Sequence, residues 1–339
     1  MKKFAVILAA LSMAACACSQ KSGDIPDVWP WNDPDADDKP FTEVTDGSFG
    51  TLPDYIKLYK SPDVLQGKHA VAWIATADLS KASLHVWGIN DPELDGSPDP
   101  LKTPTQVFNT NDGPVLVLNG GYFYTDEGVN YPASLAIENG TLLSPNINYA
   151  FNKDYSNTYY PTRAAFLVHG DGSMEVGWSY MTTDGDHFFY SVPAQNDTDT
   201  SPLGIPSATF PVEAKTLEAV TAIGAGPVLI KDGEFQNTWR FECIPGDYDV
   251  NCLGQAPRSA IGFTADGLLV LFACEGRDMT EGVPGYSTEQ VARIMQEFGC
   301  TDAINLDGGG SSCLLVNGVE TIKPSDGAQR PVGSCIYIK

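Results

Sequence analysis

The sequence predicts a strand-rich, largely antiparallel fold built from hairpins, with a few packed helices and long loop insertions in a single domain. Asn-Gly and Asp-Gly dipeptides recur between short apolar runs, which is the turn chemistry of β-hairpins. Strong helical periodicity is confined to one segment near the C-terminus. Two long polar segments, 181–220 and 236–257, show little periodicity, and we expect them to be insertions that line or cover a cleft.

The first eighteen residues have the pattern of a lipoprotein-type signal peptide. Residues 1–3 carry two lysines, residues 4–11 are apolar, and two alanines precede Cys16. Lipid attachment is expected at Cys16 or Cys18, and a plain secretory signal with incidental cysteines is the alternative. No later stretch reaches the ~18 apolar residues that a membrane span requires. The chain is therefore expected to be exported and lipid-anchored in the cell envelope, on the periplasmic side or at the cell surface.

A flexible acidic tether is predicted over residues 19–50. This segment is rich in Asp, Pro, Gly and Ser, and such a composition cannot bury a core. No second linker of this kind follows, so residues 51–339 are expected to form one domain.

Hairpins are expected in five places along that domain. In each, an apolar run precedes a dipeptide in which Asn or Asp is followed by Gly. These residue types tolerate the positive φ angles of a tight hairpin turn. The dipeptides lie at 139–140, 171–172, 232–233, 266–267 and 317–318.

Two helices are predicted. The stronger begins after Ser287, which forms a capping-box pattern with Gln290. Apolar residues then recur at i, i+3, i+4 and i+7 spacing as far as Phe298, and Gly299 is expected to end the helix. A second, shorter helix is predicted over 104–108, and the strand 302–306 should follow the first helix.

The charge balance limits the class of partner. The formal net charge is −23 at pH 7, and removing the signal with its two lysines and no acid makes it −25. This excess of acid argues against nucleic acid as a partner and against electrostatic docking on an anionic membrane. Because the chain has only six arginines, an anionic substrate would need several of them clustered.

Six cysteines lie beyond the signal, an even number that permits up to three disulfides in an exported chain. Cys243 and Cys252 bracket a polar loop and are the most plausible pair, while the other pairings stay open. The cysteine spacing is not that of a zinc site, so no metal site is predicted.

The most informative segment follows an apolar strand. Three glycines and two serines stand between that strand and the next apolar run. An ordinary hairpin needs fewer glycines. Glycine admits positive φ, so successive N–H groups could converge into a concavity for an anion or oxyanion, with a carboxylate on its rim. The candidate residues here are Asn305, Asp307, Gly308, Gly309, Gly310, Ser311 and Ser312.

A second turn of this kind, Asn119-Gly120-Gly121, follows the apolar run 114–118. The two glycine turns could meet at one site, where Asn119 would orient substrate oxygens. The alternative is two unrelated turns, with the aromatic residues that follow in the core.

Three arginines are candidates for holding an anion. A hairpin with 266–267 at its tip would bring Arg258 and Arg277 to the same open end, and a polar loop at 325–331 carries Arg330. The planar guanidinium fork matches phosphate or carboxylate. Surface salt bridges with Glu275 or Asp278 are the alternative role.

Several enzyme classes lack their signatures here. The sequence contains no HExxH, GxSxG, Walker A or GxGxxG motif, which argues against metalloproteases, α/β-hydrolases, P-loop enzymes and Rossmann dehydrogenases. The four histidines stand apart, and His85 and His169 are expected to be structural.

In their order along the chain, these motifs resemble the phosphodiester glycosidase family over roughly residues 71–338. The resemblance implies an α+β domain with a mixed sheet, and cleavage of a sugar-1-phosphodiester at the anomeric carbon to give free sugar and a phosphomonoester. The chain departs mildly from the family pattern at 223–227 and 275–277. The motifs that carry the resemblance are Asn119–Phe123, Ile223–Pro227, Pro257–Gly262, Glu275–Arg277, the capped helix, Asn305–Ser312 and Arg330–Val332.

The implied chemistry assigns roles to these residues. Arginines would hold the departing phosphate, and a carboxylate would act as nucleophile or as base for water at the oxocarbenium-like centre. Asp307 is the first choice for that carboxylate and Glu275 the second. Two other functions stay open: a surface lipoprotein that binds glycans without cleaving them, and a metal-dependent phosphodiesterase. No cofactor is required, and no motif supports the divalent cation that the many aspartates would permit.

Overall fold

The computed structural model describes residues 41–95, 99–244 and 250–339. The predicted signal peptide, with Cys16 and Cys18, and the predicted tether as far as residue 40 lie outside the described residues. The last part of that tether belongs to the fold, because Phe41 is buried against Phe298, with ring centroids 6.1 Å apart, and the next two residues pair with a strand. The folded part therefore begins at least ten residues before the predicted boundary at 51.

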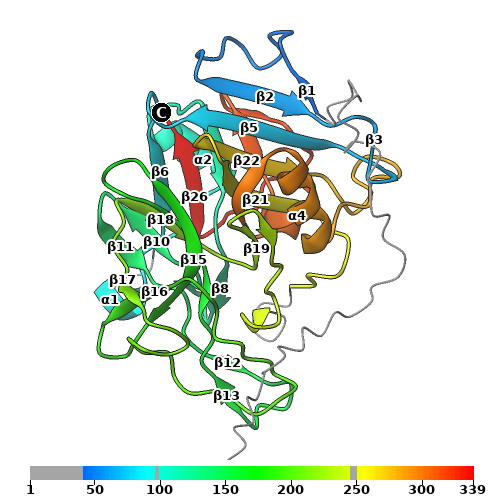
Figure 1. The fold of residues 1–339 in the computed structure, drawn as a ribbon. Coiled ribbons are helices and arrows are strands. Elements are labelled where there is room, and N and C mark those ends of the chain that lie inside the picture. The colour runs from blue at the N-terminus through cyan, green and yellow to red at the C-terminus, as the bar shows by residue number, and fades with distance from the viewer. Residues whose placement is uncertain (1–40, 96–98, 245–249) are drawn as a thin grey trace, which may run out of the picture. The chain divides into compact units, whose positions relative to one another are not determined.

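An eight-stranded sheet carries the site described below (Figure 1). Helix α4 (Thr288–Glu297) lies against its strands β19, β21 and β23. In spatial order the sheet consists of β1 (Thr42–Glu43), β2 (Ile56–Lys60), β5 (Ala72–Asp78), β22 (Leu268–Cys274), β21 (Arg258–Thr264), β23 (Cys300–Asn305), β19 (Val228–Lys231) and β20 (Glu234–Phe235).

Two further sheets complete the main framework. The seven-stranded sheet consists of β11 (Thr141–Ser144), β10 (Ala136–Glu138), β18 (Thr221–Gly224), β14 (Arg163–Val168), β15 (Met174–Met181), β16 (His187–Tyr190) and β17 (Lys215–Thr216). The five-stranded sheet consists of β25 (Val319–Glu320), β24 (Leu314–Val316), β7 (Leu116–Asn119), β26 (Ser334–Ile338) and β6 (Leu84–Gly88).

Short elements fill the connections. They are the hairpins β3–β4 (Val64–Leu65, Lys68–His69), β8–β9 (Phe123–Asp126, Val129–Pro132) and β12–β13 (Ala150–Phe151, Thr158–Tyr159), the helices α1 (Pro92–Asp95) and α2 (Pro104–Thr110), and a 3₁₀ turn (Gly309–Ser311). Every strand pair among the described residues is antiparallel. The strands and packed helices were predicted correctly, but the fold is dominated by strands, and the mixed sheet implied by the family resemblance is absent from these pairings.

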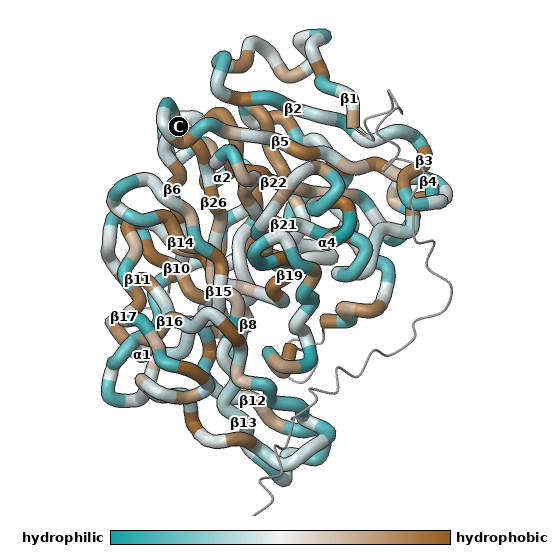
Figure 2. The backbone as a smooth tube through the Cα atoms, viewed as in Figure 1, coloured by the Kyte–Doolittle hydropathy of each residue, from teal (hydrophilic) through white to brown (hydrophobic). Residues whose placement is uncertain are grey.

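The core explains why the central strands lack an alternating pattern. In β5, Ile74 packs toward α4 while Trp73 and Ala75 face the core that the three sheets share. Both faces are covered, so six of its seven residues are buried. Figure 2 shows the brown, hydrophobic stretches concentrated along such strands. Burying each large apolar side chain stabilises the fold by about 1.5–3 kcal/mol.

All five predicted hairpins form. At 139–140, 232–233 and 317–318 both residues have positive φ, the geometry of a type I′ turn. Both predicted helices also form: α4 is capped by Ser287 and Gln290, and α2 by an equivalent capping box. Local turn and capping chemistry was therefore a sufficient guide to these elements.

The insertions differ from each other. Segment 236–257 contributes to the pocket described below, as predicted. Segment 181–220 lines a second hollow with residues 181–183, and it also carries β16 and β17, which extend the edge of the seven-stranded sheet. No disulfide forms among the described residues, so the predicted Cys243–Cys252 bond is absent from the structure. Both of these cysteines are buried.

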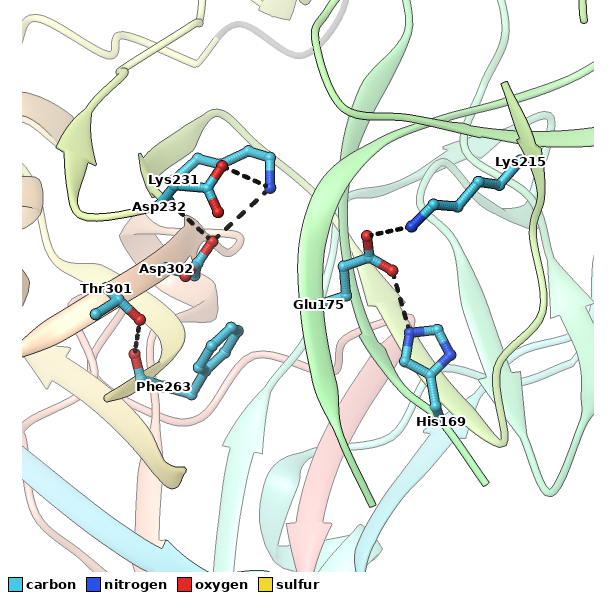
Figure 3. A network of polar contacts seen from close by, with 8 residues as sticks. All are labelled: His169, Glu175, Lys215, Lys231, Asp232, Phe263, Thr301 and Asp302. Atoms are coloured by element: carbon cyan, nitrogen blue, oxygen red, sulfur yellow. Dashed lines mark hydrogen bonds and ion pairs between the residues drawn. The ribbon is translucent and has the colours of Figure 1, made fainter. Parts of the chain in front are cut away.

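On two of the sheets, charged side chains pair with oppositely charged side chains close by in space (Figure 3). On the seven-stranded sheet, Glu175 pairs with Lys215 at 3.0 Å and with His169 at 3.2 Å. On the eight-stranded sheet, Lys231 lies 4.0 Å from Asp302. The structural role predicted for His169 agrees with this arrangement, as does that of His85, which contacts Glu138 at 2.8 Å. None of the helices described is long and apolar enough to cross a membrane.

Candidate active site

A pocket of about 290 Å³ lies where β21 begins and β23 ends. One wall is the glycine-rich loop after β23, and another is the segment 250–256. Arginine side chains from three separate parts of the chain complete it. Of the residues predicted from sequence, the pocket brings together Arg258, Arg277, Asp307, Gly308, Gly309, Gly310 and Arg330.

The β21–β22 hairpin places two of the arginines, as predicted. Arg258 opens β21 and pairs with the last residue of β22, so Arg277, three residues further on, returns to the same end. Arg258 is buried, and three backbone carbonyls hold it. Nε donates to Tyr286 (2.9 Å), and Nη2 donates to Asn251 (2.6 Å) and Gly254 (2.9 Å). Its guanidinium is therefore fixed beside the loop before any ligand arrives.

Asp326 holds the other two arginines, and sequence analysis did not single it out. One carboxylate oxygen accepts from Nη2 of Arg330 at 2.6 Å and from Nε at 3.0 Å. The other lies 3.5 Å from Nη1 of Arg277. Both arginines stay half exposed, so their guanidinium groups are positioned but reachable from solvent. The only sequence signal was that Asp326 stands four residues before Arg330 in a polar loop.

The three glycines let these guanidinium groups lie directly on the backbone. A Cβ at Gly309 would lie 2.8 Å from Nη2 of Arg277, and a Cβ at Gly310 would collide with Arg330 and Asp326. At Gly308 a Cβ would lie 2.9 Å from the carbonyl of Pro257. Close approach of the arginines is thus one physical reason for the glycine run.

Four N–H groups of this loop are used inside the protein, which leaves few for the predicted nest of converging N–H groups. The N–H of Asp307 donates to the Gly120 carbonyl (3.0 Å), and that of Gly309 to Pro257 (2.9 Å). The N–H groups of Ser311 and Ser312 close a 3₁₀ turn onto Gly308 and Gly309. With these donors used inside the protein, guanidinium groups supply most of the positive potential in the pocket.

Asp307 is the carboxylate of the pocket. It is half-buried, and burial raises the pKa of its carboxyl from an ordinary 3.8 to about 6. The Ser311 hydroxyl, Arg330, the Gly308 N–H and Arg258 each act to lower that pKa. The group is therefore mostly ionised at pH 7, yet it is a stronger base than an exposed aspartate.

Six predicted site residues lie behind the pocket rather than in it. Ser311 and Ser312 are buried and do not line the pocket, although Ser311 lies beside Asp307. The other four are Asn119, Gly120, Gly121 and Asn305.

The Asn119 amide is consumed by the protein, so its predicted role of orienting substrate oxygens is wrong. Its Nδ2 donates to the carbonyl of Asp307 (2.7 Å). Its Oδ1 accepts from the Ser259 hydroxyl (2.7 Å) and the Cys313 N–H (3.1 Å). Asn119 therefore positions the backbone of Asp307 from behind, and it connects three strands.

Gly120, Gly121 and Asn305 are likewise structural. The two glycine N–H groups donate to the carbonyl and hydroxyl of Ser334, and a Cβ at either position would collide with neighbouring atoms. The side chain of Asn305 is buried and donates to the carbonyls of Gly226 (2.9 Å) and of the residue that follows it (2.6 Å). None of these three lines the pocket.

Glu275, the second choice for the catalytic carboxylate, is buried outside this pocket. Its Oε1 accepts from the backbone N–H of Lys323 at 3.0 Å, and the residue does not line the pocket. Among the described residues, no group of three or more His, Cys, Asp or Glu could hold a metal ion.

Comparison with known proteins gives a family match and several partial likenesses. The family model described as phosphodiester glycosidase matches residues 112–339, a range that contains every residue of this pocket. A segment of 78 residues is 33% identical to the mouse N-acetylglucosamine-1-phosphodiester alpha-N-acetylglucosaminidase and 36% identical to the human protein of that name. A segment of 83 residues is 39% identical to an uncharacterized prophage-derived protein of Bacillus subtilis. These segments make up 23–24% of this chain and 12–15% of the relatives.

Solved structures share the fold. The catalytic domain of the zebrafish N-acetylglucosamine-1-phosphodiester alpha-N-acetylglucosaminidase superposes with a TM-score of 0.55 at 21% identity, covering 86% of this chain and 85% of that one. A hypothetical protein from Synechocystis gives a TM-score of 0.55 at 18% identity, covering 89% of this chain and 64% of the other.

Proposed function

The chain belongs to the phosphodiester glycosidase family, and from that membership we propose that it is a hydrolase that cleaves a sugar-1-phosphodiester at the anomeric carbon. The observation that carries the proposal is the pocket in which the Asp307 carboxylate faces a concentration of arginine charge. In a chain of net charge −23, three of the six arginines gather near only two carboxylates, Asp307 and Asp326, and this local excess of positive charge suits an anion.

The arginines would bind the phosphodiester. Arg258 is fixed by backbone carbonyls, and Arg277 and Arg330 are held by Asp326. Guanidinium groups in fixed positions stabilise charge that grows on the leaving phosphate without further reorganisation. A phosphomonoester has a second pKa of about 6, so it leaves as an anion without prior protonation. One carboxylate is then sufficient for the reaction. Among the described residues that line the pocket, Asp307 is the only acid.

Asp307 would act at the anomeric carbon. Departure of phosphate leaves an oxocarbenium-like centre, which an ionised carboxylate stabilises and either attacks or supplies with water. A pKa of about 6 suits both actions at neutral pH. Water adds a hydroxyl to the anomeric carbon, and the products are the free sugar and a phosphomonoester.

Hydrolysis in heavy-oxygen water, run on a panel of sugar-1-phosphodiesters with and without chelator, tests this function. The proposal predicts label in the sugar and none in the phosphate. Label in the phosphate would contradict it and indicate a phosphodiesterase, and a ligand bound but unchanged after long incubation would indicate a glycan-binding protein.

We also propose that the protein is exported and lipid-anchored through Cys16 or Cys18, where it would act on envelope or host glycans. The support is the sequence pattern of residues 1–18 alone. Intact-mass measurement of protein extracted from host membranes checks this, and an N-terminus without acylation at either cysteine would contradict it.

A further inference from the structure

A second hollow, of about 340 Å³, lies away from the arginine pocket and shares no lining residue with it. Its walls are the β8–β9 hairpin, the loops 145–149 and 181–183, and residues 91 and 94 at helix α1 (Figure 1 labels β8 and α1). Segments far apart in the sequence thus meet around one concave surface.

Aromatic rings form much of this surface. Tyr124 and Tyr131 are directly opposite each other across the β8–β9 hairpin, and their rings stack with centroids 5.1 Å apart and planes inclined by 13°. Tyr124 is 40% exposed and Tyr149 39%. Single exposed apolar side chains are normal on a surface. Here Leu94, Tyr124 and Tyr149, all exposed, line the same hollow.

Side-chain hydrogen bonds to backbone carbonyls hold the walls, so the hollow does not depend on a ligand for its shape. Asn148 donates to the carbonyl of Met181 at 2.9 Å, which joins the two loops. The buried Arg163 donates to the carbonyl of Tyr149 at 3.3 Å. The tyrosine rings are therefore presented on a preformed support, which lowers the entropic cost of binding.

The polar groups of the hollow define the charge of its ligand. Asp91, Asn148, Thr182 and Thr183 stand among the rings, and none of the described lining residues is basic. An anion would find no cation there and would face the Asp91 carboxylate. A ligand for this surface needs an apolar face for the rings and hydroxyl groups for the rim, without negative charge.

We propose that this hollow binds an uncharged sugar ring within an oligosaccharide. A pyranose presents axial C–H groups that pack on an aromatic face, while its equatorial hydroxyls bond to amide, hydroxyl and carboxylate groups at the rim. The hollow is a glycan-binding site apart from the anionic pocket. It would hold a neutral part of a glycan whether or not the chain hydrolyses a phosphodiester.

An array of neutral oligosaccharides, followed by calorimetric titration of the best ligand, tests the site. The full-length protein and Asp307→Asn should bind equally, because that substitution lies in the other pocket. The double variant Tyr124→Ala/Tyr149→Ala should bind roughly tenfold more weakly or worse, the loss expected when aromatic anchors are truncated. The double variant with Phe at both positions keeps the rings and should retain most of the affinity. Phe235→Ala, an equally exposed ring outside the hollow, is the matched control.

Hydrogen exchange of the wild-type protein gives a second readout that needs no variant. The bound oligosaccharide should slow exchange in 123–132, 145–149 and 181–183, and leave 307–312 unchanged. The proposal is overturned if no neutral oligosaccharide binds at millimolar concentration, if Tyr124→Ala/Tyr149→Ala binds as well as wild type, or if protection appears around Asp307 instead. A peptide that binds this hollow while sugars do not would overturn it equally.

Discussion

Two polar regions meet at Asp307, and they differ in what their side chains bind. In front, Arg277 and Arg330 are half exposed and are held by one carboxylate. Behind, the amides of Asn119 and Asn305 are buried and bond to backbone and side-chain groups of the protein itself. The front can therefore bind a ligand, whereas the back fixes the loop that presents the carboxylate. The back comes from the two glycine motifs, whereas the arginines in front come from the end of the β21–β22 hairpin and from the loop 325–331.

The largest effect is expected from a substitution of Asp307, where the two regions meet. Asp307→Asn keeps the shape of the side chain and removes its charge, so turnover should fall by well over the ~10²-fold typical of a positioned acid or base. Steady-state kinetics on a sugar-1-phosphodiester measures this, with a melting curve as the control for folding. A folded variant that keeps more than a tenth of the wild-type rate would contradict the assignment.

A substitution in the back region should lower the stability of the fold. Asn119→Ala leaves the Asp307 carbonyl, the Ser259 hydroxyl and the Cys313 N–H buried without their partner, and should cost roughly 3 kcal/mol of unfolding free energy. Denaturant titration measures the loss. Asn157→Ala, at an exposed asparagine, is the control and should stay within about 0.5 kcal/mol. Equal values for the two variants would mean that Asn119 does not connect these strands.

The pH dependence of kcat/KM and of stability tests the role of the Asp307 carboxylate. Because Asp307 must be ionised to act, kcat/KM should fall about tenfold per pH unit below pH 6. The free energy of unfolding should depend on pH in the opposite direction. A carboxyl whose pKa is raised on folding stabilises the fold when it is protonated, and this contribution is lost as pH rises through about 6. Asp307→Asn should therefore not be less stable than wild type at pH 8. A rate profile that is flat from pH 4 to 8 would exclude Asp307 as the titrating group.

The smallest effect is expected from a substitution of Asp326, the carboxylate that holds Arg277 and Arg330. Asp326→Asn removes ion pairs to half-exposed groups, and such pairs are worth little in water, so we expect about a fivefold loss of kcat/KM on an anionic substrate. Asp278→Asn removes the same charge from the exposed Asp278 nearby and serves as control. Equal effects of the two variants would mean that charge alone, and not the position of Arg277 and Arg330, is at stake.

Local chemistry was sufficient to predict much of this molecule. The capping box at 287–290, the five turn dipeptides and the return of Arg258 and Arg277 to one hairpin end all depend on neighbouring residues. A strand-end motif, in contrast, does not reveal which way its side chains point. Asn119 and Asp307 stand in similar strings, yet only one faces the pocket, because the other is covered by Ser259 and Cys313.

Two further features depended on distant contacts and could not be predicted. Asp326 lies 49 residues from Arg277, and no local pattern indicates that the two side chains pair. The sequence predicts that the glycines form a nest of N–H groups, whereas in the structure Gly309 and Gly310 make room for guanidinium groups from elsewhere in the chain.

The most direct test of the account is the effect of Arg277→Ala on two substrates, a sugar-1-phosphodiester and a neutral aryl glycoside of the same sugar. Arg277 is half exposed and its loss should leave the fold intact, unlike loss of the buried Arg258. The account predicts a loss of roughly 30-fold or more in kcat/KM on the phosphodiester, partial recovery in Arg277→Lys, and a much smaller loss on the neutral glycoside. Equal losses on both substrates would show that the arginine is structural and that the pocket does not bind phosphate.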